Sequence, residues 1–506
     1  MRPSRARALS GMLLRYFGRR VLRSGVLASR PLRLAAALLV AGLAVVAVVA
    51  AVTFLEPLRS EPEAWDLLFD ATSISAVLWC LVAVLLTKTL FLNAEGMLAL
   101  TFALPVTNRE RAAAFVLFEA ATAGIVVAAG VGAMAVAALV LRGPSALLPL
   151  VESIVLPVLL TYLVVGLAYQ LLTWVLTAVG LRRTQPPVLL LSLFALLIAY
   201  AATVPRLTAA VSGSYLEGTD ERPWTAGVAS LADQWGHPAA LATCAAAMAV
   251  LAVATVALAP NRHLTASRYL PWRAGALTRR LLGPYDWCVF RSLQTWLPTV
   301  LAAAVYVALT IKPLAHPMWA LSLVSMGALY QFAATEPLRR LRGGRTPAWS
   351  VYVRLLRAQA LLWLLLAVPA TAAVLVVEPG AVADVVDPLV GSLAGTVLAL
   401  AVGIVFPAVD DNPFSLFVGL SLAVVVVTAL ALAIGVLSLP PPVAAALAVA
   451  TLALAVVYSV VGITTHESRR RHEEVADRRQ QRGRGGAADP RRRRRDPAGA
   501  HVLDGR

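Results

Sequence analysis

The chain contains only two lysines, Lys88 and Lys312, among its 44 basic residues. Neither follows a glycine, so the chain has no Gly-x-x-x-x-Gly-Lys-[Ser/Thr] loop, whose lysine contacts nucleotide phosphates. None of the six histidines lies in a His-Glu-x-x-His pattern, and no Gly-x-Ser-x-Gly sequence occurs. We therefore expect no enzymatic activity in this chain, and no catalytic, cofactor-binding or metal-binding residues.

Cysteine is also scarce. The three residues are Cys80, Cys244 and Cys288, without paired spacing, and the first two fall within apolar runs. This pattern favours neither a disulfide framework nor a thiolate metal site. We expect the cysteines to be small packing residues.

Charged residues make up only 14% of the chain, hydrophobic residues make up 59%, and the mean hydropathy is +0.77. A soluble domain is roughly 45–50% apolar and about 25% charged. The apolar residues come in runs of about 20, the length that a helix needs to cross a bilayer core of about 30 Å. The alternating strands of about 10 residues that build outer-membrane barrels do not occur. The sequence therefore predicts an all-α polytopic membrane protein.

Twelve runs qualify as transmembrane spans, and they divide into two groups of six. The predicted spans are 34–54, 71–92, 112–141, 154–180, 187–204, 238–259, 295–311, 317–335, 356–377, 388–409, 414–436 and 442–464.

Basic residues indicate the orientation, because they are retained on the cytoplasmic side. With the N-terminus inside, the outer segments hold few of them: Arg59, Arg142, Arg206, Arg222 and Lys312. We therefore predict a multi-pass protein of the cell (plasma) membrane with both termini cytoplasmic.

The same pattern divides the chain into five parts. They are a basic cytoplasmic N-terminus (1–33), a first six-helix half (34–260), a basic cytoplasmic linker (261–294), a second six-helix half (295–464) and a polybasic tail (465–506). The apolar run of the first span is too long for a cleavable signal. The tail has too few aliphatic residues to form a core, so we expect it to be disordered. We expect the basic inner face to attract anionic membrane lipids, and we expect no nucleic acid partner.

One inner connection interrupts the apolar pattern sharply. Residues 98–119 read LALTFALPVTNRERAAAFVLFE. Pro105 ends the preceding run, and Thr107-Asn-Arg-Glu110 fits a capping box, in which the Thr hydroxyl and the Glu carboxylate each satisfy a backbone amide. The stretch therefore predicts a helix that stops and a new helix that starts at the cytoplasmic face.

The second half has a counterpart between its second and third spans. There Thr346 can cap a helix that has Pro347 at its first position, where the missing amide costs nothing. Thr107 and Thr346 lie roughly half the chain apart. We therefore hypothesise that the two halves arose by duplication, as in many transporters.

These residues carry a family resemblance. Leu104, Pro105, Val106, Thr107, Arg109 and Glu110 resemble the Leu-Pro-(Val/Ile)-(Ser/Thr)-x-Arg-Glu-like segment that precedes a long span in permeases of type-2 ATP-binding-cassette exporters. The match covers about twenty residues, with a weaker echo at 336–357. Members usually have six spans, so twelve would resemble a fused pair. A basic residue that the class often has later in the segment is replaced here by Ala and Phe.

The resemblance implies a separate ATPase subunit, which uses the ATP and docks at 93–111 and 336–355. The residues of this expected coupling segment are Leu104, Pro105, Thr107, Arg109, Glu110, Arg111, Arg339, Arg340, Arg342 and Thr346.

Two ionisable residues within spans, Lys88 and Glu119, are further candidates, because charge inside a bilayer is a functional signal. Two interpretations remain open. They lie near the inner interface, snorkelling or paired with each other, or they form a pair that couples transport to protons or substrate.

Three functions follow from these patterns. The first is an exporter permease for a hydrophobic or amphipathic substrate, since the spans carry little polarity. The second is a major-facilitator-like secondary transporter, although the Gly-x-x-x-Asp-Arg-x-Gly-Arg-like signature of that class is missing between spans 2 and 3. The third is a non-transporting membrane scaffold.

Overall fold

The computed structural model describes residues 2–23, 29–91, 101–102, 104–181, 185–217, 222–259, 269, 282–311, 315–341, 346–378, 380, 382–407, 414–436 and 439–486. Within these ranges every regular element is a helix, as the apolar composition predicts. A helix satisfies its own backbone hydrogen bonds, which makes it suitable for a bilayer that offers no water.

The first half of the chain forms a bundle around α3 and α5. Its helices are α1 (Pro3–Arg23), α2 (Arg30–Leu55), η2 (Glu56–Leu58), α3 (Pro62–Phe91), α5 (Asn108–Arg142), η3 (Gly143–Ala146), α6 (Leu147–Leu150), η4 (Val151–Val155), α7 (Leu156–Ala178), α8 (Gln185–Glu217), η5 (Trp224–Ala226), α9 (Gly227–Trp235) and α10 (His237–Ala257).

The second half is built around α17 and α18. Its helices are α12 (Pro284–Arg291), α13 (Leu293–Ile311), η6 (Pro317–Leu321), α14 (Ser322–Ser325), α15 (Ala328–Ala334), α16 (Glu336–Leu341), α17 (Ala348–Val377), α18 (Val382–Val405), α19 (Phe414–Val436) and α20 (Pro441–Gly486).

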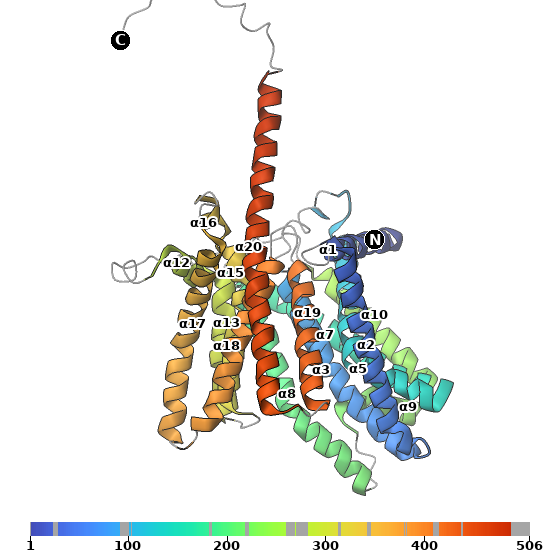
Figure 1. Cartoon of the computed structure of the whole chain (residues 1–506). Coiled ribbons are helices and arrows are strands. Elements are labelled where there is room, and N and C mark those ends of the chain that lie inside the picture. The colour runs from blue at the N-terminus through green and yellow to red at the C-terminus, as the bar shows by residue number, and fades with distance from the viewer. Residues whose placement is uncertain are drawn as a thin grey trace, which may run out of the picture.

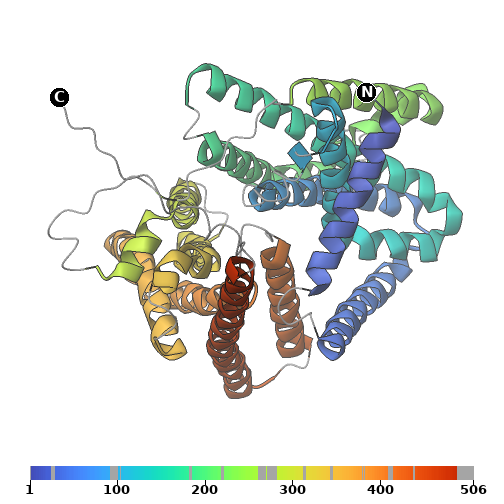
Figure 2. The same cartoon turned by 90° about the horizontal axis from the view of Figure 1, so that it is seen from above.

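The two halves are separate packing units that lie side by side. Helix α3 packs against α5, α7 and α8, whereas α18 packs against α14, α15 and α20. Figure 2 shows the helices of the first half (blue to green) on one side and those of the second half (yellow to red) on the other. The halves meet where α19 contacts α1 and α2, and where α8 contacts α13.

Nine helices in the described part of the chain are long and apolar enough to cross a membrane, fewer than the twelve predicted spans. One of the nine is the run 108–178, which contains both α5 and α7. Two predicted spans have no such helix. The span at 317–335 is divided among η6, α14 and α15, and within α19 only Gly419–Leu432 qualifies, as a shorter apolar helix.

Helices α1 and α16 lie at the same end of the bundle, and α20 extends far beyond that end (Figure 1). The expectation of a disordered tail from residue 465 is wrong for its first part, because α20 remains helical through Gly486. Residues 487–506 lie outside the described ranges.

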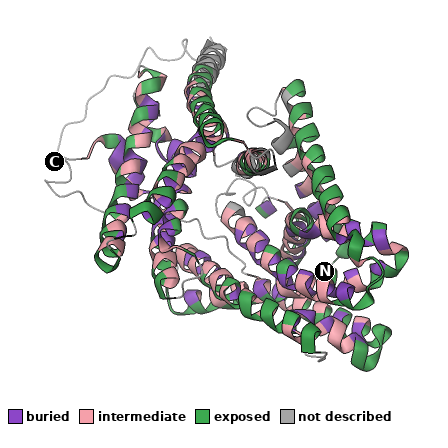
Figure 3. Cartoon of the chain, turned by 60° about the horizontal axis from the view of Figure 1, so that its bottom comes forward, coloured by how far each residue is buried: buried purple, intermediate pink, exposed green. Residues whose placement is uncertain are grey.

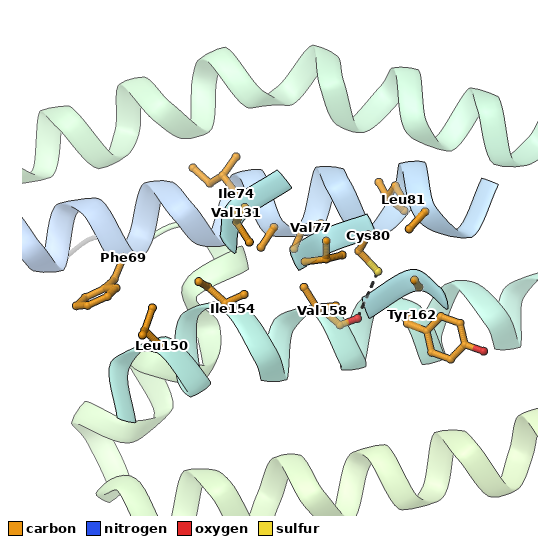
Figure 4. Close-up of a cluster of buried hydrophobic side chains, with 14 of the residues drawn as sticks. Phe69, Ile74, Val77, Cys80, Leu81, Val131, Leu150, Ile154, Val158 and Tyr162 are labelled. Carbon is orange, nitrogen blue, oxygen red and sulfur yellow. Dashed lines mark hydrogen bonds between the residues drawn. The ribbon is translucent and has the colours of Figure 1, made fainter. Parts of the chain in front are cut away.

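Burial is greatest where the helices face one another, and many outward faces are apolar and exposed (Figure 3). The largest buried cluster joins α3, α5, α7 and α8. Figure 4 shows part of it, with Ile74 of α3, Val131 of α5 and Val158 of α7. Helices α2 and α17 carry exposed Val and Leu side chains on their outer faces. That arrangement is typical of a protein whose outer surface contacts lipid.

Candidate functional site: the capped segment and two intramembrane polar clusters

The start of α5 carries the predicted capping box. The backbone amide of Glu110 donates to Thr107 Oγ1 at 3.3 Å, and the amide of Thr107 donates to Glu110 Oε2 at 3.1 Å. A third donor comes from the start of the chain: the backbone N–H of Arg2 donates to Glu110 Oε1 at 3.0 Å. The Glu110 carboxylate therefore joins the start of α5 to the start of α1.

Helix α1 is held on α5 by apolar side chains as well. Leu9 and Leu13 of α1 are buried against Ala114 and Phe118 of α5. Other positions of α1 are exposed, among them Arg5, Met12, Arg15 and Arg19. Helix α1 is thus an amphipathic helix whose apolar face covers the first turns of α5.

The remaining residues of the first coupling segment divide into exposed and buried positions. Pro105, Thr107 and Arg109 are exposed, and Leu104 is partly buried beside α1. Arg111 is buried: its Nε donates to the Thr101 carbonyl oxygen at 3.3 Å, and its guanidinium lies 3.8 Å from the centre of the Phe102 ring. Arg111 is a structural residue of this segment and offers no surface to a partner.

The second segment differs from its expected form. Arg339 is buried, donates to the Phe332 carbonyl oxygen at 2.6 Å and stacks on the Phe332 ring. Arg340 is exposed and pairs with Glu336 one turn earlier. The predicted Thr346 cap is wrong: Pro347 occupies the N-cap position of α17, which has no side-chain capping bond. Arg342 lies outside the described residues.

Lys88 and Glu119 form an ion pair between α3 and α5. Lys88 Nζ lies 2.6 Å from Glu119 Oε2, and each side chain is 12% exposed. Tyr162 of α7 donates to Glu119 Oε2 at 3.4 Å, and the Lys88 ammonium lies 4.8 Å from the centre of the Tyr169 ring. Lys88 and Glu119 are therefore paired, which is part of both interpretations that the sequence leaves open.

The second half holds an uncharged pair at the corresponding place. Gln331 of α15 donates from its amide to Gln359 Oε1 of α17, and Gln359 Nε2 donates to the Val324 carbonyl oxygen at 2.6 Å. Both glutamines are fully buried. They bridge the second and third spans of their half, as Lys88 and Glu119 do in the other half.

A second contact repeats between the second and fourth spans of each half. In the first half Cys80 Sγ donates to the Val158 carbonyl oxygen at 3.4 Å (Figure 4). In the second half Ser325 Oγ donates to the Ser392 carbonyl oxygen at 2.8 Å. A polar pair and a small side chain on a backbone carbonyl thus join α3 to α5 and α7, and join α14 and α15 to α17 and α18.

The polar cluster of the second half was missed from the sequence. Around Ser325 the hydroxyl of Thr396 donates to Ser325 Oγ at 3.1 Å, and Trp363 Nε1 donates to Ser392 Oγ at 2.9 Å. A signal did exist: small residues recur every four positions along α18, at Gly391, Gly395, Ala399 and Gly403. That spacing indicates the close approach of another helix.

At the end of the bundle away from α1, Glu152 is buried in η4, a π-helical turn, and lies 2.8 Å from His237 Nδ1. Within the described ranges no group of three or more His, Cys, Asp or Glu side chains is placed to hold a metal ion. The chain matches no protein-family model, no curated protein and no solved structure.

Proposed function

We propose that this chain is the membrane permease subunit of an ATP-binding-cassette exporter, driven by a separate ATPase subunit. In this proposal the chain crosses the cell membrane twelve times in two six-span halves, with both termini in the cytoplasm. The observation that carries the proposal is the capped start of α5, which exposes Pro105, Thr107 and Arg109 at the end of the bundle where α1 lies.

The rigidity of this segment supports a coupling role. A partner that pushes on residues 105–109 acts directly on α5, because the capping box fixes the segment to the helix start. The same force reaches α1 through the Arg2–Glu110 hydrogen bond. A loose loop would absorb such a displacement, whereas a capped helix transmits it.

The second docking point is α16 and the start of α17. Arg340 is exposed there and takes the role of the basic contact, as Arg109 does in the first half. Arg111 and Arg339 do not belong to the proposed interface, because both side chains are buried and their guanidinium groups pack on Phe102 and Phe332.

The proposed substrate is hydrophobic or amphipathic. The Lys88 and Glu119 charges neutralise each other, and the inner cluster of the second half consists of amides and hydroxyls. Neither cluster offers an unpaired charge to a strongly ionic substrate.

Affinity purification of the tagged chain in mild detergent tests the proposal. We expect a stoichiometric subunit with Walker motifs, and we expect Arg109→Glu to release it. Arg59→Glu is the matched control, because Arg59 is also exposed but lies at the other end of the bundle. Recovery of the chain without an ATPase, in several detergents, would refute the exporter proposal.

A second candidate, a proton-coupled secondary transporter, is favoured by the Lys88–Glu119 pair within the membrane. In that case Glu119→Gln would abolish transport driven by a proton gradient while the protein remains folded. Unchanged transport at normal expression would remove this candidate.

A further inference from the structure

The second span of the second half is interrupted between α14 and α15. Through Met326 and Gly327 the backbone bonds run three residues back, from the Met326 amide to Leu323 and from the Gly327 amide to Val324. The first half has an unbroken helix, α3, at this position. Within a membrane, irregular backbone is tolerated where it is enclosed by protein or lines a cavity, and transporters place binding sites at such breaks.

Helix α18 encloses the break. A Cβ atom added at Gly403 would overlap the Leu329 carbonyl oxygen, and one added at Gly395 would lie 3.3 Å from Ser325 Oγ. Only glycine allows α18 to approach α15 so closely. The 3₁₀ turn at Met326–Gly327 is therefore part of this packing, with polar groups held against it from α13, α17 and α18.

Two polar atoms at the break have no partner. Gln331 Oε1 and Thr295 Oγ1 are buried, make no hydrogen bond, and belong to residues that are fully inaccessible to solvent. Thr295 lies beside the break, since its Cγ2 is 3.4 Å from the Cβ position of Gly327, and the Gln359 amide nitrogen is 3.5 Å from the same position.

The direction of the Gln331 amide follows from its neighbours. Gln359 must turn its NH₂ group toward the Val324 carbonyl oxygen, so its oxygen faces Gln331. Gln331 then has to present its own NH₂ group to that oxygen, which leaves Gln331 Oε1 pointing away as a free acceptor. An amide oxygen only accepts, and a hydroxyl both accepts and donates.

We propose that the break at Met326–Gly327 is the binding site for the uncharged hydrogen-bond-donating group of an amphipathic substrate, a hydroxyl or an amide N–H. Gln331 Oε1 accepts that hydrogen bond and the Thr295 hydroxyl provides the second contact. Gln331 lies one turn from the end of its span at Thr335, so the site takes an apolar molecule whose polar group lies near one membrane surface. This inference rests on the proposed transport function, and it specifies the substrate class.

The experiment uses two photoreactive probes with the purified full-length chain in detergent. One is decanol carrying an aliphatic diazirine, and the other is its methyl ether, which cannot donate a hydrogen bond. Crosslinked peptides are identified by mass spectrometry, and unlabelled decanol is the competitor. We expect saturable labelling by the alcohol in segments 293–311 and 322–341, about tenfold weaker for the ether, as expected for one lost hydrogen bond.

Gln331→Leu and Thr295→Val should each reduce the saturable labelling about tenfold. Gln185→Leu is the matched control, because Gln185 also has a buried, unpartnered amide oxygen, at the start of α8. Equal labelling by the alcohol and the ether, or labelling unchanged in Gln331→Leu, would overturn the site. Because no ATPase takes part, this result is separate from the outcome of the purification that tests the exporter proposal.

Discussion

Gln331 donates a hydrogen bond to Gln359 across the same pair of spans that Lys88 and Glu119 join in the other half. One polar bridge, between α3 and α5, is charged, and the other, between α15 and α17, is neutral. This relationship supports the hypothesis of a duplicated architecture, and it gives the two bridges different responses to mutation.

Removing one partner of the Lys88–Glu119 pair should lower the free energy of unfolding more than removing both partners. In Lys88→Met the Glu119 carboxylate is left buried without its counter-ion, and we expect a loss of about 3 kcal/mol in the free energy of unfolding. The double variant Lys88→Met/Glu119→Leu should recover most of this loss. Thermal unfolding in detergent, followed by size-exclusion fluorescence, measures both.

Arg340→Ala is the control for the charged bridge, because the Arg340–Glu336 pair is exposed. We expect a change below about 1 kcal/mol there. A Lys88→Met variant as stable as Arg340→Ala would show that the Lys88–Glu119 pair does not support the fold.

Substitution at Gly403 should separate α18 from α15. The added methyl group of Gly403→Ala would overlap the Leu329 carbonyl, so we expect a loss of about 1–3 kcal/mol in stability. Gly132→Ala in α5 is the matched control, since nothing lies within 4 Å of its Cβ position, and it should gain up to about 1 kcal/mol from helix propensity. Equal melting temperatures for the two variants would contradict the close approach.

Glu110→Ala should release α1. The variant loses the acceptor for the Arg2 and Thr107 amides, so we expect severalfold faster hydrogen exchange in residues 2–13. Glu336→Ala, which removes a surface carboxylate outside this contact, should leave exchange in α1 unchanged. If exchange in α1 is unaffected by Glu110→Ala, the apolar contacts alone hold the helix.

Cys288 of α12 should react slowly with maleimide at neutral pH. Burial raises the pKa of the Cys288 thiol above its ordinary value, so less of the reactive thiolate is present at pH 7. Labelling should accelerate as the pH rises toward the raised pKa, and also when the protein is denatured. Ser145→Cys, at an exposed position, is the reference; comparable rates for the two thiols at pH 7 would contradict the prediction.

The features that depend on local chemistry were predictable from the sequence. The Thr107–Glu110 capping box needs only four residues, and the helical class follows from the length of the apolar runs. The structure shows Lys88 paired with Glu119, and a pair is part of both interpretations of these two residues.

Features that depend on packing were not predictable in the same way. Hydropathy averages over a window, so it cannot detect that residues 317–335 are divided at Met326–Gly327 while remaining apolar. As a charged residue in a basic segment, Arg339 is expected to be exposed. It is buried because its guanidinium lies over the Phe332 ring and donates to the Phe332 carbonyl oxygen. Thr346 fits a cap by residue type, but Pro347 already supplies the extended residue before α17.

The length of α20 has a mechanical consequence. At about 1.5 Å per residue, the helix continues about 27 Å beyond Ser468 to Gly486 as the same element that packs on α17 and α18. A Cβ atom added at Gly462 would lie 3.1 Å from Ile404, so α20 and α18 are in close contact. A force applied to the part of α20 beyond Ser468 therefore acts on α18, and α18 in turn packs against α14 and α15.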